Sequence, residues 1–339
     1  MSSRVVASIC LLSVLLAAPV VAAPAPATSD ATPHRIALQM IGDYPRVQVH
    51  VEGIDRPLSF VVDTAAGATL IDVALAEASG LFDAPDDGGV KVTGAGGSGG
   101  SVRRTGLRDL HAGNFHRKTQ MLAMDLSALA RPGVNPADGV LGNDLMAAFD
   151  LRFDLPAGEM LLAQPGSLPR SGCLDNALPE RAANIRQFPF VEAQMRDGAR
   201  QSPATVLVDT GAARSVLNVV AARALGLEAG DARLRRSNAV VGGVSGDFFE
   251  TSFYTLPSLQ IGAWQRDAHE LLITEMPVLH QLGLTDRPAL ILGIDALRDT
   301  RVDVLANAEA VCFGPQGSDD PDAASTAPRT DANGMAPAR

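Results

Sequence analysis

The sequence predicts a turn-rich, all-β protein built from two similar lobes in one chain. Its 339 residues are enough for about two domains at roughly 150 residues each. The 32 glycines and 22 prolines suit a β protein with many turns better than a helical bundle. The decisive observation is an internal repeat, in which the segment around Asp63-Thr64 recurs around Asp209-Thr210 at an offset near 146 residues. A repeat at one offset indicates a duplicated structural unit.

Charge and cysteine content exclude several classes of protein. The 28 Lys and Arg residues against 38 Asp and Glu residues give a net charge of -10, and a nucleic-acid partner would require a basic face instead. The three cysteines are too few for a disulfide framework or for a zinc site with four thiolates. The six histidines show no ligand spacing, so no metal site is expected.

The N-terminal residues 1–23 have the three-part layout of a secretory signal peptide. Arg4 precedes an apolar run from Val5 to Val21, and the small residues Ala22 and Ala23 follow. We expect cleavage in this small-residue region, a linker over residues 24–33, and a secreted or periplasmic protein without stable membrane insertion. The alternative is an uncleaved anchor, because the apolar run is nearly long enough to span a bilayer.

Each copy of the repeat reads as strand, turn, strand and short helix. The helices are expected at Val73–Ser79 and Val219–Leu225. Each follows a residue suited to an N-cap and ends at a glycine suited to a left-handed conformation. These flanking residues are Asp72 and Gly80 in the first copy, and Asn218 and Gly226 in the second.

The repeat continues after insertions, which lengthen the offset slightly. Gly139–Asp144 matches Leu290–Asp295, and an alternating hairpin follows each segment. The hairpins are expected at Leu151–Leu162 and Val302–Phe313. We place the lobes at residues 34–164 and 184–314, joined by a linker at 165–183, and expect a disordered tail at 315–339 because it lacks apolar periodicity.

Asp63 and Asp209 each follow an apolar strand and precede a threonine. Two such loops face to face would bring the carboxyl groups within hydrogen-bonding distance. Like charges that close cannot both ionise, so the pair would hold one proton and titrate as a unit. The carboxylate could then act as a base toward water while the protonated partner polarises a carbonyl group.

On these motifs the sequence resembles an aspartic protease of the retropepsin-like kind, with two lobes fused in one chain. The resemblance implies the bilobal acid-protease fold, with two homologous β-barrel-like lobes, one short helix in each, and an active site between them. It also implies that Asp63 and Asp209 form the catalytic pair of an endopeptidase that hydrolyses a polypeptide substrate without cofactor. One chain would be the working monomer, a pseudo-dimer carrying both half-sites.

The same resemblance assigns supporting roles around the pair. Two apolar-Gly segments, ending at Gly142 and Gly293, would pass beneath the active-site loops. A flexible flap is implied in each lobe, at Val92–Gly100 and Val240–Phe248. The residues implied to support the loops are Thr64, Ala65, Thr210, Gly211, Gly142 and Gly293, and those implied at the flaps and substrate are Gly94, Gly96, Gly97, Gly242 and Gly243.

Two departures from the family pattern motivate an alternative function. Ala65 stands where the family has glycine, and neither flap carries a tyrosine. The alternative is a catalytically weak or inactive two-lobed protein that binds peptides. A metal-dependent or nucleophilic hydrolase is a third class without supporting spacing: the glycine-rich Gly94–Gly100 matches GxGxxG and GxSxG, but no helical pattern follows it.

Removal of the signal peptide would leave Cys173 and Cys312 as the remaining cysteines. Two thiols in an oxidising compartment usually pair, so a disulfide between them is expected. Two buried, unpaired cysteines are the alternative.

Overall fold

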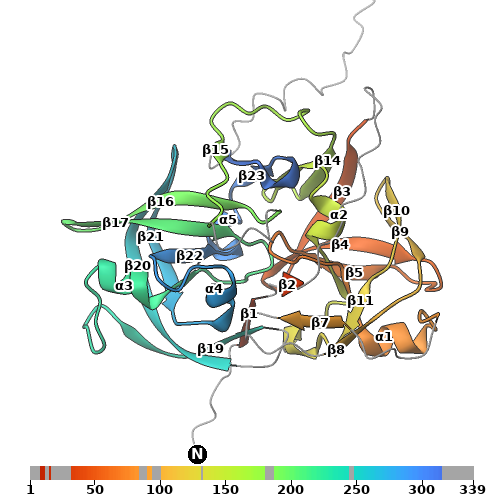
Figure 1. Cartoon of the computed structure of the whole chain (residues 1–339), viewed down its shortest axis with the longest axis horizontal. Coiled ribbons are helices and arrows are strands. Elements are labelled where there is room, and N and C mark those ends of the chain that lie inside the picture. Colours follow the sequence, from red (N-terminus) through yellow and green to blue (C-terminus); the bar gives the residue numbers. More distant parts are fainter. Residues whose placement is uncertain are drawn as a thin grey trace, which may run out of the picture.

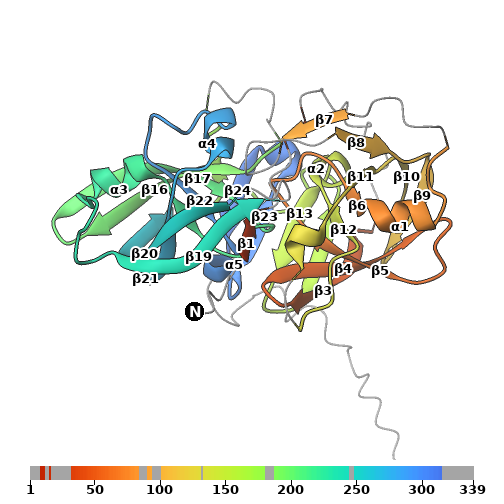
Figure 2. The same cartoon turned by 90° about the horizontal axis from the view of Figure 1, so that it is seen from below.

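Two β-rich lobes lie side by side in the computed structural model (Figures 1 and 2). The structure describes residues 8–11, 15–16, 32–83, 90–93, 101–130, 133–179, 187–243 and 248–314. Most of the predicted signal peptide, most of the linker at 24–33 and the tail at 315–339 lie outside these residues. No helix within the described part of the chain is both long and apolar enough to cross a membrane.

Lobe one contains short strands and two short helices. In chain order these are β3 (His34–Ile41), β4 (Tyr44–Val51), β5 (Leu58–Val62), β6 (Leu70–Asp72), α1 (Val73–Ala78), β7 (Val90–Thr93), β8 (Ser101–Arg104), β9 (Arg108–Ala112), β10 (Phe115–Thr119), β11 (Leu122–Met124), the 3-10 helix η1 (Ser127–Leu129), β12 (Gly139–Leu141), α2 (Asn143–Met146), β13 (Asp150–Asp154) and β14 (Glu159–Ala163).

Lobe two repeats this plan after a connecting segment that contains β15 (Leu174–Asp175). Its elements are β16 (Phe190–Asp197), β17 (Arg200–Val208), β18 (Val216–Leu217), α3 (Val219–Ala224), β19 (Arg235–Gly243), β20 (Phe248–Ile261), β21 (Trp264–Ile273), α4 (Pro277–Gln281), β22 (Ala289–Leu292), α5 (Ile294–Leu297), β23 (Arg301–Val304), η3 (Ala306–Ala308) and β24 (Ala310–Phe313).

The two lobes share the same central strand order, which confirms the repeat. In lobe one the order is β5-β12-β6-β11, and in lobe two it is β17-β22-β18-β21. The innermost strands are buried along their whole length, as in β12 and β22, whereas β16 alternates buried and exposed residues. Strands covered on both faces become continuous apolar runs. β12 and β22 lie beside β5 and β17, the strands that end at the two aspartates.

Both predicted capped helices are confirmed. The Asp72 carboxylate accepts a hydrogen bond from the N–H of Leu75, and the Asn218 side chain accepts one from the N–H of Ala221. Gly80 and Gly226, which follow the helices, have φ angles of 63° and 66°, in the left-handed region that favours glycine. The helices α2, α4 and α5 are additional, because the sequence pattern predicted one short helix in each lobe.

The lobes are joined by one continuous sheet. The predicted hairpins form β13–β14 in lobe one and β23–β24 in lobe two, and β13 pairs antiparallel with β23 across the lobe boundary. Arg152 lies opposite Asp303 in this pairing. Its Nε and one terminal nitrogen each donate to the carboxylate at 2.9 Å, and the two side chains are only 12% and 4% exposed. A bidentate, buried pair of this kind strongly favours a single arrangement of the lobes.

Two short N-terminal strands lie between the lobes (Figure 1). β1 (Ser8–Leu11) pairs in parallel with residues 240–243 of β19, and β2 (Leu15–Leu16) pairs antiparallel with residues 92–93 of β7. Both partners belong to the segments expected to form flaps. The edges of β7 and β19 can therefore pair with an extended chain.

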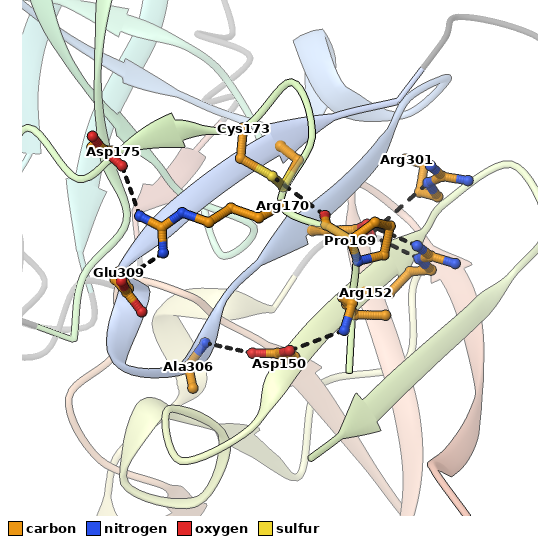
Figure 3. The surroundings of a disulfide bond; sticks show 12 residues. Asp150, Arg152, Pro169, Arg170, Cys173, Asp175, Arg301, Ala306 and Glu309 are labelled. Atoms are coloured by element: carbon orange, nitrogen blue, oxygen red, sulfur yellow. Dashed lines mark hydrogen bonds and ion pairs between the residues drawn. A yellow bond between two sulfur atoms is a disulfide. The ribbon is translucent and has the colours of Figure 1, made fainter. Parts of the chain in front are cut away.

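The structure joins Cys173 and Cys312 in a disulfide, as predicted, with their Cα atoms 4.1 Å apart. The bond ties the segment between the lobes to the last strand of lobe two, beside the pairing of β15 with β24 (Figure 3). Arg170 reinforces the same junction, because its guanidinium donates to Glu309 and to Asp175 at 2.5 and 2.8 Å.

Replacing both cysteines with serine is expected to lower the free energy of unfolding by about 2–5 kcal/mol, because the bond closes a long loop in the unfolded chain. The two cysteines are 139 residues apart, for which the loop-entropy estimate of about 5 kcal/mol is an upper figure. Denaturant titration of both proteins measures the difference. Detection of two free thiols by mass spectrometry of the alkylated, unreduced protein would contradict the pairing.

Candidate active site

The strands β5 and β17 end at the centre of the molecule and place Asp63 and Asp209 there. Both aspartates are completely buried, at 0% exposure. The parallel neighbours of these strands, β12 and β22, fix where each loop begins. The N–H of Asp63 donates to the carbonyl of Leu141 at 3.1 Å, and that of Asp209 donates to the carbonyl of Leu292 at 3.0 Å. The two loops are therefore positioned in the same way from opposite sides.

Four hydrogen bonds connect the two loops through their threonines. The hydroxyl of Thr64 donates to the carbonyl of Val208 at 2.7 Å, and the hydroxyl of Thr210 donates to the carbonyl of Val62 at 2.8 Å. Each threonine N–H also donates to the hydroxyl of the other, at 3.1 Å in both directions. The bonds are reciprocal, so neither loop can shift without breaking contacts with the other.

The two aspartates have equivalent surroundings. The N–H of Ala65 donates to Asp63 Oδ1 at 2.7 Å, and the N–H of Gly211 donates to Asp209 Oδ1 at 2.8 Å. Burial and the charge and hydrogen bonding of Asp209 raise the pKa of Asp63 well above its ordinary value, against the N–H groups of Ala65 and Ala66, which lower it. A buried pair of this kind retains one proton that a separate surface aspartate would lose.

The alanine at position 65 is compatible with the loop. Residue 65 is absent from the non-glycine residues with positive φ, so a side chain costs no backbone strain there. The equivalent position in lobe two is different: a Cβ atom added to Gly211 would lie 2.3 Å from Cγ of Asp63. The loop pair thus has room for one methyl group but requires glycine on the other side.

Gly142 and Gly293 lie where the segments after β12 and β22 pass close behind the loops. A Cβ atom at Gly142 would lie 2.4 Å from the carbonyl oxygen of Ala68, and one at Gly293 would lie 2.7 Å from that of Ala212. Contacts this close exclude any side chain. Both glycines therefore allow the close approach that the family resemblance implied.

A partly buried carboxylate behind each loop was not among the sequence predictions. In lobe one the hydroxyl of Thr69 donates to Asp144 at 2.7 Å and accepts the N–H of Gly142 at 3.2 Å. Burial raises the pKa of Asp144 to about 6, against the hydrogen bonds from Thr69 that lower it. In lobe two Ser215 and Asp295 make the matching bond at 2.7 Å. The repeat did contain a signal for these residues, because Ser215 and Asp295 stand at the positions equivalent to Thr69 and Asp144.

The carboxylate of lobe two has basic neighbours. Nε of Arg214 lies 3.4 Å from Asp295, and Nε2 of His269 lies 3.1 Å from the hydroxyl of Ser215. Burial lowers the pKa of His269, partly offset by the charge of Asp295. Serine, histidine and aspartate are the residue types of a nucleophilic triad, but this serine is completely buried and donates to the aspartate. The cluster therefore supports the loop and does not present a nucleophile.

The predicted flap segments correspond in part to described strands. β7 and β8 pair antiparallel, as do β19 and β20, so each expected flap is bounded by a hairpin. Gly242 and Gly243 lie at the end of β19. Gly94, Gly96 and Gly97 lie outside the described residues. No group of three or more potential metal ligands occurs in the part of the chain that is described.

A sequence model described as aspartyl protease matches the chain twice, over residues 47–145 and 191–296. Together the two matches cover more than half of the chain. Each lobe thus contains one match, and each match includes an aspartate, its threonine and the glycine behind the loop. No curated protein matches the chain.

Proposed function

Because the chain belongs to the retropepsin-like aspartyl protease family, we propose that it is an aspartic endopeptidase with Asp63 and Asp209 as its catalytic residues. The reciprocal threonine bonds carry this proposal. They hold two buried carboxyl groups from opposite lobes in one site, which is the arrangement that catalysis by a carboxyl pair sharing one proton requires. We further propose that one chain is the active unit, since it supplies both halves of the site.

In the proposed reaction the ionised carboxylate of the pair accepts a proton from a water molecule, whose oxygen attacks the peptide carbonyl carbon. The protonated carboxyl group donates its proton to the carbonyl oxygen, which gives a neutral tetrahedral diol. As the carbon–nitrogen bond breaks, the carboxyl group that took the proton from water donates it to the leaving amine nitrogen. The other carboxylate accepts a proton from one hydroxyl of the diol, which gives the carboxylic acid product and restores the singly protonated pair. The raised pKa of Asp63 supports the proton that this sequence requires.

The substrate is proposed to be an extended polypeptide segment. The edges of β7 and β19 pair with β2 and β1 between the lobes, which supports recognition of an extended substrate by added backbone hydrogen bonds. Secretion or a periplasmic location also remains part of the proposal. It rests on the signal-peptide pattern of residues 1–23 and on the disulfide, because such bonds persist in oxidising compartments.

Hydrolysis of an unfolded protein tests this function. Fragments should appear at mildly acidic pH and should disappear when pepstatin, an inhibitor that mimics the tetrahedral diol, is added. Chelator-sensitive hydrolysis would instead indicate a metal enzyme. Binding of peptides without cleavage by the intact wild-type protein would indicate the alternative, a catalytically weak or inactive two-lobed protein that binds peptides.

The pH profile of kcat/KM is expected to be bell-shaped with a maximum at roughly pH 4–6. The raised pKa of Asp63 moves the loss of the shared proton to higher pH. Ala66 and Ala212 stand three residues after the aspartates, where pepsin-like relatives typically place a hydroxyl that donates to a carboxylate and lowers its pKa. Pepsin, which titrates at about 1.5 and 4.7, should therefore work at lower pH.

Replacing Ala212 with serine is the companion measurement. A new donor to the ionised form should shift the maximum downward by a measurable fraction of a pH unit. A native maximum near pH 2, or no shift in a folded and active variant, would show that another group controls the profile.

A further inference from the structure

A cavity of about 700 Å³ opens in lobe two between α3 and the strands β20 and β21. None of the residues of the two catalytic loops lines it. Val219, Leu227 and Ile273 contribute an apolar surface, and Glu228 and Glu275 contribute carboxylates. A space of this size, apolar with a few polar groups, has the dimensions of a ligand site.

The duplicated architecture shows what occupies the equivalent place in lobe one. Arg103 of β8 lies opposite Ala123 of β11, just as Ser252 of β20 lies opposite Ile273 of β21. The guanidinium carbon of Arg103 lies 3.7 Å from the centre of the Phe82 ring. In lobe one, therefore, an arginine side chain fills the space between helix and strand.

Lobe two has lost both groups that make this arrangement. Ser252, the counterpart of Arg103, is too short to fill the space. Glu228 stands at the position that matches Phe82 in the repeat. The change leaves a cavity and replaces an aromatic ring with a carboxylate. Ser252 itself lines the cavity, so the space that Arg103 fills in lobe one is open here. Arg236 of β19 lies opposite Ser252 but is not one of the residues that line the cavity.

The charges around the cavity favour a cation. Glu228, Glu250 and Glu275 line it together with one arginine, Arg223, and the three carboxylates outnumber that arginine. Within the described residues, the side chains of Glu228 and Glu250 make no ion pair. Glu275 accepts the N–H of Val219 at 2.9 Å with one of its two oxygens. Carboxylates that are not neutralised nearby attract a positive ligand group.

We propose that this cavity binds an arginine or lysine side chain of a polypeptide, outside the catalytic cleft. The aliphatic stem would lie on the apolar surface and the charged head would meet the carboxylates, as long basic side chains commonly do. Arg223 occupies the position of Glu77, which pairs with Arg103 in lobe one. At the rim it can donate to a main-chain carbonyl of the ligand. The site would add a preference for basic segments to whatever the cleft itself recognises.

Binding of a matched peptide pair tests the proposal without reference to catalysis. The probes are capped heptapeptides of alanine and leucine with a central arginine or its neutral isostere citrulline. Titration into the Asp63→Asn protein, which prevents cleavage, should show at least about tenfold tighter binding of the arginine peptide. High salt should reduce this difference. Equal binding of the two peptides, or no binding of the arginine peptide at millimolar concentration, would overturn the proposal.

A second variant places the site in this cavity. Glu228→Phe combined with Ser252→Arg rebuilds the arrangement of lobe one and should remove the preference for arginine over citrulline. Asp267→Asn with Asp286→Asn changes the net charge equally, uses residues outside the cavity, and should keep the preference. If the rebuilt variant fails to fold, Glu228→Gln with Glu250→Gln removes two exposed carboxylates and should weaken arginine binding at least tenfold. A preference retained in either cavity variant would contradict the assignment, whereas the hydrolysis assay judges the catalytic proposal separately.

Discussion

Replacing Asp63 or Asp209 with asparagine is expected to lower kcat by about 10²–10⁴-fold, the range over which positioned acids and bases contribute to catalysis. Asparagine keeps the shape of the side chain but cannot exchange a proton. One remaining carboxyl group cannot be base and acid at once, so each single variant should lose nearly all activity. Steady-state kinetics on a peptide substrate measures the loss.

Thermal unfolding of the same variants separates catalysis from folding. The pKa of Asp63 is raised in the folded protein, so its contribution to stability is complete below the unfolded pKa near 3.9 and is lost as the pH rises through the folded value. Asparagine does not ionise, so the Asp63→Asn protein does not lose this stability as the pH rises. At pH 7 the Asp63→Asn protein should therefore have a Tm equal to or above that of the wild type, and a variant that kept near-native turnover would show that its aspartate lies outside the pair.

Replacing Gly211 with alanine is expected to lower kcat/KM by at least about 10²-fold, the effect of displacing a reacting group by around 1 Å. The added Cβ atom would lie 2.3 Å from Cγ and Oδ2 of Asp63. The carboxyl group cannot move away freely, because the N–H of Ala65 holds its other oxygen at 2.7 Å. Overpacking should also lower the free energy of unfolding by about 1–3 kcal/mol.

The matched control is Ala65→Gly, which makes the reverse change at the equivalent position of lobe one. Its methyl group already fits, so its removal should leave kcat/KM within a few-fold of the wild type. Greater freedom of the unfolded chain should lower the free energy of unfolding by about 0.4–1 kcal/mol. If Gly211→Ala stays folded with activity close to that of this control, the required glycine would not be a feature of the site.

Much of the fold could be predicted because its signals are local or repeated. Asp72 and Asn218 mark helix starts by their capping chemistry, and the repeat aligns Asp63 with Asp209 before any contact is known. The supporting carboxylate of Asp144 escaped prediction because its partner Thr69 lies 75 residues away in the chain. Its role depends on burial behind a loop, which composition and periodicity do not reveal.

The pairing across the lobe boundary escaped prediction for a related reason. Each hairpin is recognisable by its alternating apolar and polar residues, but neither sequence indicates that its edge pairs with the other hairpin. The cavity in lobe two also escaped prediction. It lies where lobe two has Ser252 and lobe one has Arg103, and it is recognised only when the packing of the two lobes is compared.

The pairing of Arg152 with Asp303 determines which kinds of lobe can associate at this sheet. The two residues occupy equivalent positions in the repeat and face each other across the pseudo-twofold axis. In a symmetric dimer of identical lobes, the same residue would stand at both places, so arginine would face arginine or aspartate would face aspartate. Such like charges repel when buried. The unlike pair of Arg152 and Asp303 therefore favours association of the two different lobes over a homodimer of either lobe.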